Sequence, residues 1–494
     1  MLPSQARNST LALWAVILPA ALVLRLARFV GWGLGDDAYF AWIANRLARG
    51  GPLDLDFGVG YRLGLHLPNA LSFALFGTND VAFVLYPLLC SLGTVLLAYC
   101  IGRRIAGPGV GLIGATLLAF SSFDVAFAST MTIDVVVAFL SALTVLLFLK
   151  AEEVSGRLAS LLWSLSALTL GFAYMVKIPA LALAGVLALY TATTPRGFVR
   201  HAPFYAVLTA VWAGLCLADY VHSGRFLNYW ILERACAPKY VPGHLAQVLA
   251  YYPRVMFLPA VTFDTLVFGL SFHAAVPALA YALFARLRQC RLLVLWVSGL
   301  FLFFEFLPGR LGLPYEPLPR FLRYLDALIV PSLLLVAVAL DALASRSRLA
   351  ASGALVVLLA SSTAAGGRIA AVYHDALRDE RLAASFLESL PADAVFTDNR
   401  LFDRLNFQQA YSGRLHLVWM QTHIEQGRTP AWLAALGPGY VVTGGARGPE
   451  VSRHAVFELG SLRPPPLWLL LNTIEGAPQP WRREPLQIFY APQP

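Results

Sequence analysis

Long apolar stretches recur through most of this chain, and no other feature of the sequence constrains its fold as strongly. A run of roughly 17 to 25 mainly apolar residues is long enough to cross the hydrocarbon core of a bilayer as a helix. About eleven such stretches are predicted, near residues 11-30, 81-101, 110-128, 132-149, 160-176, 178-194, 203-221, 256-284, 292-308, 324-344 and 349-371. Only 13% of the residues are charged, whereas soluble domains carry about 25%. The sequence therefore predicts a mainly α-helical, polytopic membrane protein.

Clusters of basic residues fall in alternate loops between these stretches. They comprise Arg103 and Arg104, Lys150 and Arg157, Arg196 and Arg200, Arg286 to Arg291, and Arg346 and Arg348. The positive-inside rule places them in the cytoplasm together with the N-terminus. An odd number of spans then puts the C-terminus outside. Arginine-rich, lysine-poor usage indicates a bacterium, so the expected location is the bacterial plasma (inner) membrane. The scattering of the basic residues argues against nucleic-acid binding.

The character of the sequence changes near residue 373, where a second domain is predicted. Residues 1-372 are expected to form the membrane domain, with a long first outer loop at 31-80. Residues 373-494 are expected to form a small extracytoplasmic α/β domain. A polar helix is predicted at 378-390, followed by strands at 394-398, 415-420, 439-444, 455-460 and 486-491. No nucleotide-binding, nucleophile-elbow or metal-ligand motif is present there, which favours recognition or covering of a site over catalysis.

A pair of acids, Asp36 and Asp37, stands at the start of the first outer loop. The segment 37-49 that follows has the apolar periodicity of an amphipathic helix lying in the membrane interface. Aspartate is a preferred N-cap, and a second acid in the first turn is stabilised by the helix dipole by about 0.3–1 kcal/mol. Capping and catalysis are both open for this pair, since one carboxylate can do both.

Further charges stand at the predicted outer ends of apolar stretches. Asp134 lies at the mouth of the fourth span, where an acid next to hydrocarbon is a functional candidate. For Asp124, one short loop earlier, the sequence favours neither function nor structure. Lys177 interrupts two apolar stretches and would either snorkel to the headgroups or bind a phosphate. Arg323 and Tyr324 precede the tenth span, where such residues are also common interface anchors. Basic residues on this side indicate an anionic ligand, or else contact with anionic lipids.

The order of these features resembles the polyprenyl-phosphate-dependent membrane glycosyltransferases of the GT-C fold, the group with the aminoarabinose transferases and protein O-mannosyltransferases. The matching segments are GDDAYFAW with Asp36 and Asp37, LSFALFG at 71-77, TID at 132-134, KIP at 177-179 and RYLDALIVP at 323-331. Where many relatives carry Lys-Pro-Pro-Leu, this chain has GYRLGLHLP, so Arg62 and His66 are expected to replace that lysine. The oligosaccharyltransferase signature WWDxG is absent from the C-terminal domain.

The resemblance implies an inverting transfer of a sugar from a polyprenyl-phosphate donor to a hydroxyl of an envelope lipid, glycan or protein acceptor. It favours Asp36 as the base, with Asp37 orienting or coordinating, although the residues alone do not separate the two. Because phosphate leaves as an anion, a second proton-donating carboxylate is unnecessary. Phosphate binding is expected from Lys177, Arg323, Tyr324, Arg62 and His66, and Asp134 is expected to shape the catalytic site.

No cofactor is certain. A divalent Mg²⁺ or Mn²⁺ ion could bind Asp36 or Asp37, but the sequence contains no recognisable ligand set. Expected partners are the donor lipid, the acceptor and membrane lipids, with no nucleic acid. A lipid-linked glycan flippase or transporter would share the many spans and the basic cavity, although neither related halves nor broken midplane helices are visible. A scaffold for other envelope enzymes is the third alternative.

Overall fold

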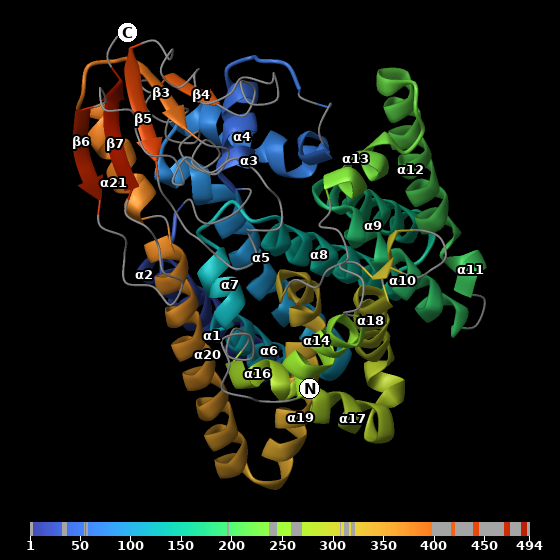
Figure 1. Cartoon of the computed structure of the whole chain (residues 1–494). Coiled ribbons are helices and arrows are strands. Elements are labelled where there is room, and N and C mark those ends of the chain that lie inside the picture. Colours follow the sequence, from blue (N-terminus) through green and yellow to red (C-terminus); the bar gives the residue numbers. More distant parts are fainter. Residues whose placement is uncertain are drawn as a thin grey trace. The chain divides into compact units, whose positions relative to one another are not determined.

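The computed structural model in Figure 1 covers the whole chain. The structure describes residues 3–31, 37–53, 55, 58–194, 197–236, 245–257, 269–306, 308–310, 316–317, 322–376, 378–397, 416–419, 438–443, 469–474 and 486–491. Within these ranges most of the chain is helical, as the apolar stretches predict.

In the described part of the chain, eight helical segments are long and apolar enough to cross a membrane. Five of them are single helices: α5 (Asp80–Ala106), α8 (Ile133–Glu153), α9 (Gly156–Val176), α12 (Ala202–Ser223) and α18 (Leu287–Phe306). The span Asn8–Ala27 combines part of α1 (Pro3–Ala12) with the π-helix η1 (Leu13–Ile17) and α2 (Leu18–Ala27). The last two are Arg323–Arg346, which combines most of η4 (Leu322–Leu328) with α19 (Ile329–Arg346), and Arg348–Val372, which lies within α20 (Arg348–Ala376). These eight coincide with predicted spans, and the fold class, a polytopic helical membrane protein, is confirmed.

The other three predicted spans fall on shorter apolar helices. These are α6 (Pro108–Ala119), η3 (Ile178–Leu181) with α10 (Ala182–Ala192), and α16 (Gly269–His273) with α17 (Ala275–Ala285). A fourth short apolar helix, α4 (Leu63–Phe76), lies inside the predicted first outer loop and was not predicted. The remaining helices are α3 (Asp37–Ala48), η2 (Gly58–Tyr61), α7 (Ser122–Phe127), α11 (Gly197–Arg200), α13 (Asn228–Cys236), α14 (Leu245–Phe257) and α21 (Arg378–Glu388).

The chain divides into two compact units. The first comprises Met1–Phe29, Pro52–Pro68 and Val84–Ala370, and the second comprises Val30–Gly51, Asn69–Phe83 and Ala371–Pro494. The predicted site residues Asp134, Lys177, Arg323, Tyr324, Arg62 and His66 belong to the first unit. Asp36 and Asp37 belong to the second.

Glycines allow close helix packing in the first unit. A Cβ atom added at Gly102 of α5 would lie 2.9 Å from the Cα of Gly111 in α6. One added at Gly171 of α9 would lie 2.6 Å from the side chain of Val211 in α12. Between helices in a bilayer, small residues bring backbones together and so replace the hydrophobic driving force that water supplies to soluble proteins.

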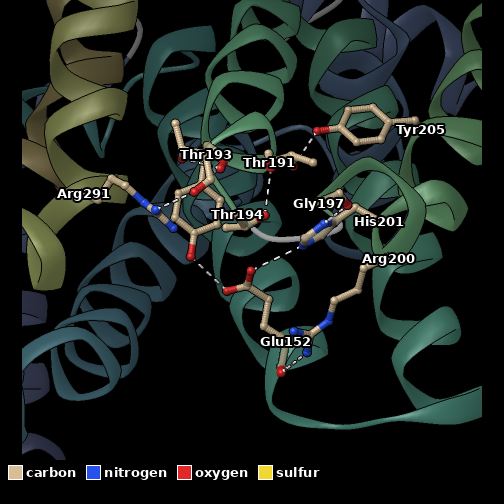
Figure 2. Close-up of polar contacts among 10 residues, drawn as sticks. Glu152, Thr191, Thr193, Thr194, Gly197, Arg200, His201, Tyr205 and Arg291 are labelled. Carbon is tan, nitrogen blue, oxygen red and sulfur yellow. Dashed lines mark hydrogen bonds and ion pairs between the residues drawn. The ribbon is translucent and has the colours of Figure 1, made fainter.

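A polar network joins helix ends where basic clusters were predicted to share one side of the membrane (Figure 2). Glu152, near the end of α8, accepts a hydrogen bond from Tyr190 at 3.1 Å and contacts His201 Nε2 at 3.3 Å. The Arg200 guanidinium donates to the Glu152 carbonyl at 2.5 Å, and Arg291 donates to Thr193 O at 2.9 Å. The ends of α8, α10, α11 and α18 therefore lie together.

A buried ion pair fixes the first helix of this unit. Arg25 of α2 is fully buried and pairs with Asp124 in the first turn of α7. Its Nε donates to Ser91 Oγ at 2.5 Å, and Ser91 in turn donates to Asp124 Oδ2 at 2.5 Å. Its Nη1 donates to the carbonyls of Ala21 and Ala119 at 2.9 and 3.0 Å. Asp124, about which the sequence was neutral, therefore has a structural partner.

The second unit contains a five-stranded sheet in the order β4-β3-β5-β7-β6. The strands are β3 (Ala394–Thr397), β4 (His416–Trp419), β5 (Gly439–Thr443), β6 (Leu469–Ile474) and β7 (Leu486–Ala491). β3 pairs in parallel with β4 and β5, whereas β7 pairs antiparallel with β5 and β6. Helix α21 packs on β6 and β7 (Figure 1). Four predicted strands coincide with observed ones, 455-460 lies outside the described residues, and β6 was not predicted.

A short two-stranded sheet in the first unit completes the strands that the structure describes. β1 (Pro308–Arg310) pairs antiparallel with β2 (Glu316–Pro317), with a register shift between them. It follows directly after α18.

Candidate functional site

Lys177 stands at a break between two helices. Helix α9 ends at Val176, and Lys177 is its C-cap with an extended backbone at φ −159° and ψ 124°. The 3₁₀ helix η3 then begins with Ile178 and Pro179. Pro179 has no N–H to continue the hydrogen-bond ladder of α9 and favours the first turn of a new helix, so the sequence KIP sets this break. The break places a lysine between two apolar helices.

Asp134 is the ion-pair partner of Lys177. The lysine Nζ lies 2.5 Å from Asp134 Oδ1, and the two side chains are only 11% and 4% exposed. Asp134 stands in the first turn of α8, after the N-cap Thr132, whose hydroxyl accepts a hydrogen bond from the Asp134 backbone N–H at 3.4 Å. The positive end of the helix dipole stabilises the carboxylate there. The structure thus joins two residues that the sequence proposed separately.

Tyr324 completes the cluster around the ammonium group. The Lys177 Nζ lies 4.2 Å from the centre of the Tyr324 ring, which is within cation–π range. Burial lowers the pKa of Lys177, Asp134 opposes that shift, and the charges of Arg323 and Arg62 add to it. Asp134, or another anion in its place, therefore favours the protonated amine.

A small pocket lies beside these three residues. Asp134, Lys177 and Tyr324 line it together with the hydroxyl-bearing Ser141. Its remaining lining is apolar and consists of Val137, Pro179, Ala180, Leu183, Leu300, Phe304 and Ala327. The Lys177 pocket, as we call this space, therefore has one charged end and one apolar wall. That division fits an amphiphilic ligand with an anionic head.

Arg62 lies at the end of η2, within electrostatic reach of Lys177 and Tyr324. Its Nε and Nη2 bind the Glu233 carboxylate of α13 at 3.0 and 3.3 Å. Such a two-pronged arginine–carboxylate contact fixes orientation as well as charge. His66, one turn further along, is fully buried, and its Nε2 lies 2.9 Å from Val59 O. Arg62 and His66 are thus held on η2 and α4.

An aromatic cluster holds α13 against η2. The rings of Tyr61 and Tyr229 stack at 5.4 Å, and Tyr174 packs edge-on to Tyr229 at 5.7 Å. Asn228 donates to the Tyr61 hydroxyl at 2.8 Å, and Trp230 donates to that of Tyr174 at 2.9 Å. Burial raises the pKa of Tyr229, so its phenol stays protonated.

The backbones of η2 and α13 also meet closely. A Cβ atom added at Gly58 would lie 2.8 Å from the backbone nitrogen of Glu233. Any side chain at this position would therefore push α13 away. The contacts of Gly58, Arg62 and the aromatic cluster together fix α13 beside the Lys177 pocket.

The ion pair of Arg62 and Glu233 should contribute measurably to stability. Arg62→Ala or Glu233→Ala alone is expected to lower the free energy of unfolding by about 1.5–3 kcal/mol, the range for a hydrogen bond to a charged group. The charge-swapped double variant Arg62→Glu with Glu233→Arg should regain part of this loss. Thermal unfolding of the wild type, the two single variants and the double variant Arg62→Ala with Glu233→Ala, in one lipid or detergent system, gives the coupling energy. Additive losses, or no recovery in the swapped protein, would contradict the pairing.

The structure does not test the role of the two acids that the sequence proposes as catalytic. Asp36 lies outside the described residues. Asp37 is 7% exposed and stands in the first turn of α3, where a carboxylate is favoured by the helix dipole. Their catalytic role stays a prediction. Sequence reasoning did not single out Glu233 as the partner of Arg62, since no signal in the sequence links two residues so far apart.

Metal binding also stays a prediction. Among the residues that the structure describes, no group of three or more His, Cys, Asp or Glu side chains is placed to hold a metal ion. Asp36, one of the two ligands suggested by the sequence, is outside that set.

Known proteins resemble this chain in sequence and in fold. Residues 68–218 match the family model described as dolichyl-phosphate-mannose-protein mannosyltransferase. No protein in the curated set matches the sequence. ArnT from Cupriavidus metallidurans, in the crystal structure bound to undecaprenyl phosphate, superposes with a TM-score of 0.64 at 15% identity, over 97% of this chain and 98% of that one.

Archaeal oligosaccharyltransferase structures are similar over a smaller part of their length. The Archaeoglobus fulgidus enzyme in complex with Zn and sulfate gives a TM-score of 0.56 at 14% identity, over 81% of this chain and 62% of that one. The complex of AglB from the same organism with an inhibitory peptide and a dolichol-phosphate gives a TM-score of 0.53 at 12% identity, over 81% of this chain and 63% of that one. The predicted resemblance is thereby confirmed: this chain has the GT-C fold of the polyprenyl-phosphate-dependent membrane glycosyltransferases.

Proposed function

We propose that the protein is an inverting glycosyltransferase that moves a sugar from a polyprenyl-phosphate donor to a hydroxyl of an envelope lipid, glycan or protein. The observation that carries this proposal is the Lys177 pocket. Its charged end, made by Lys177, Asp134 and Tyr324, suits a phosphate, and its apolar wall suits the first part of a prenyl chain. ArnT and AglB, which share the fold, have been crystallised or solved with undecaprenyl phosphate and a dolichol-phosphate, respectively.

In this proposal Lys177 binds the donor phosphate. In the structure its ammonium group is paired with Asp134 at 2.5 Å. A phosphate entering the pocket is a second anion for the same cation, and it supports the protonated amine that burial disfavours. Arg323 and Arg62 add positive charge nearby. Groups fixed in this way stabilise the charge that develops on the leaving phosphate without having to reorganise during the reaction.

The acid pair of the first outer loop supplies the base. Asp36, or Asp37 in its place, takes the proton of the acceptor hydroxyl as the oxygen attacks the anomeric carbon. Attack comes from the face opposite the phosphate, so the configuration at that carbon inverts. The bond between carbon and phosphate oxygen breaks, and the phosphate leaves as an anion with the electron pair. No second acid is required.

The membrane arrangement belongs to the proposal as well. The N-terminus and the network in Figure 2 would face the cytoplasm of a bacterium. The Lys177 pocket, the acid pair and the C-terminal α/β domain would face the periplasm. In that arrangement the C-terminal domain is available to recognise the acceptor or to cover the site.

Replacing the pocket lysine tests the function directly. Lys177→Ala is expected to raise the Michaelis constant for a prenyl-phosphate sugar at least tenfold, because a cation that binds the phosphate is lost. This corresponds to about 1.4 kcal/mol or more of binding free energy. The Michaelis constant for the acceptor should change less. The assay is sugar transfer by the purified full chain in lipid vesicles, with donor and acceptor varied separately.

Lys150→Ala is the matched control, since Lys150 lies in the last turn of α8, about 24 Å along the helix from Asp134. It should behave as the wild type. If Lys177→Ala leaves the Michaelis constants for the donor and the acceptor unchanged, the alternative is favoured in which Lys177 only contacts lipid headgroups. Movement of labelled lipid across the vesicle without sugar transfer would identify a flippase instead.

A further inference from the structure

Asp326 is a buried acid with no role in the mechanism above. It lies in η4 between Tyr324 and Ala327, which both line the Lys177 pocket. Its own side chain is outside that lining and the residue is only 1% exposed. Within the described part of the chain its Oδ2 has no hydrogen-bond partner. A buried carboxylate with an oxygen that accepts no hydrogen bond is destabilised relative to a neutral carboxyl group.

The charged groups around Asp326 already form ion pairs with other residues. Asp124, Asp134 and Lys177 are the charged groups that act on it. Asp124 is paired with Arg25, and Asp134 with Lys177. No ion pair of Asp326 itself occurs among the described residues. An ionised Asp326 would be a buried carboxylate without a cation of its own.

We propose that Asp326 holds its proton when the donor binds, and that it is a positioning residue that sets the affinity of the Lys177 pocket for the donor phosphate. This inference rests on the proposed function. With a neutral Asp326, Lys177 has one carboxylate neighbour, Asp134, and its ammonium group can bind a phosphate as well. An ionised Asp326 would attract Lys177 and place another negative charge behind the phosphate position.

Several titratable groups share the surroundings of η4. They are Asp124 of α7, Asp134 of α8, the buried Glu305 of α18, Lys177 beside η3, and Arg323 and Tyr324 on η4 itself. Lys177 also loses its proton as the pH rises, and that loss weakens phosphate binding too. A variant that cannot ionise at position 326 separates the two titrations. Asp326→Asn keeps the size of the side chain and stays neutral at every pH.

The experiment has two arms on the purified full chain in lipid. Infrared spectra at neutral pH compare the wild type with Asp326→Asn in the carbonyl region of a protonated carboxyl group. Asp80→Asn, which changes an exposed acid at the start of α5, is the control. In parallel, the Michaelis constant for the prenyl-phosphate sugar is measured across a rising pH series for all three proteins.

The wild type and Asp80→Asn are expected to show a protonated-carboxyl band that Asp326→Asn lacks. Their donor constant should begin to rise at a lower pH than that of Asp326→Asn, because only they acquire the extra negative charge. The same spectrum in wild type and Asp326→Asn, or superimposable pH profiles of the donor constant, would overturn the inference. If Asp326→Asn does not fold, the wild type alone is followed through the pH series. Loss of its protonated-carboxyl band over the pH range in which the Michaelis constant for the donor rises would support the inference. A band that persists through that rise would refute the inference.

Failure of the proposed function can be told apart from failure of this inference. If Lys177→Ala leaves the donor constant unchanged, the phosphate assignment is wrong. The infrared arm still decides the protonation of Asp326 in that case, because it needs no substrate.

Discussion

Replacement of Asp36 and Asp37 together by asparagine is expected to lower sugar transfer by about 10²- to 10⁴-fold, the range that a positioned general base contributes. Asparagine cannot take the proton of the acceptor hydroxyl. It is nevertheless a good N-cap, so the helix that begins at Asp37 should remain folded. The Michaelis constant for the donor should change little, because the proposed phosphate-binding residues are untouched. Single-turnover transfer by the purified protein in vesicles measures the effect.

The single variants assign the base. Loss in Asp36→Asn with activity retained in Asp37→Asn would agree with the resemblance, and the reverse result would give the role to Asp37. Asp80→Asn is again a suitable control, because Asp80 is an exposed acid in the first turn of α5. If the double variant transfers sugar at nearly the wild-type rate, these acids are helix caps and the base lies elsewhere.

Breaking the ion pair between Arg25 and Asp124 should have the largest effect on stability. Arg25→Met or Asp124→Leu alone leaves one charge buried without a partner, which in other proteins costs about 3–5 kcal/mol. Both residues are almost fully buried, so water cannot compensate. We expect a large fall in the thermal unfolding midpoint of either variant in detergent. Arg25→Met and Asp124→Leu combined should recover much of it, since two apolar side chains of similar size often replace a buried pair without loss.

Donor binding provides the second readout for this pair. Because Arg25 is contacted by Ser91, Asp124, Ala21 and Ala119 rather than by the pocket lining, the folded fraction of the double variant should keep its donor constant. A double variant that is as unstable as the single ones would show that the hydrogen bonds of Arg25 to Ser91 and to the Ala119 carbonyl, and not the charge pair, hold α2 in place.

The central part of the site was predictable because charges in apolar stretches are rare. Asp134 and Lys177 interrupt long apolar runs, and KIP contains its own helix break, so each stood out in the sequence. Their pairing could be anticipated only as a common location on one side of the membrane. The 2.5 Å contact depends on how α8 and α9 pack, which no local pattern encodes. The same holds for Tyr324, which alone would be an ordinary interface anchor.

Other parts of the site could not be predicted because the roles of their side chains depend on residues far away in the sequence. Arg62 was predicted as a phosphate-binding group, but the ion pair with Glu233 depends on the fold of α13. Asp326 stands within the segment RYLDALIVP that carried the resemblance, yet only its burial and its lack of a hydrogen bond at Oδ2 distinguish it. Strand β6 was not predicted because Leu469–Ile474 follows a proline-rich stretch of sequence and lacks a clear alternation of apolar and polar residues.

The Lys177 pocket also bears on how the enzyme would meet its donor. The pocket is small and is lined by only eleven of the described residues, so a long prenyl chain would have most of its length outside, among the lipids. The protein would then discriminate between donors at the headgroup and the first carbons, and would be tolerant of chain length. The bilayer would act as a two-dimensional reservoir, and the abundance of donor in the leaflet, rather than its concentration in water, would set the rate of capture.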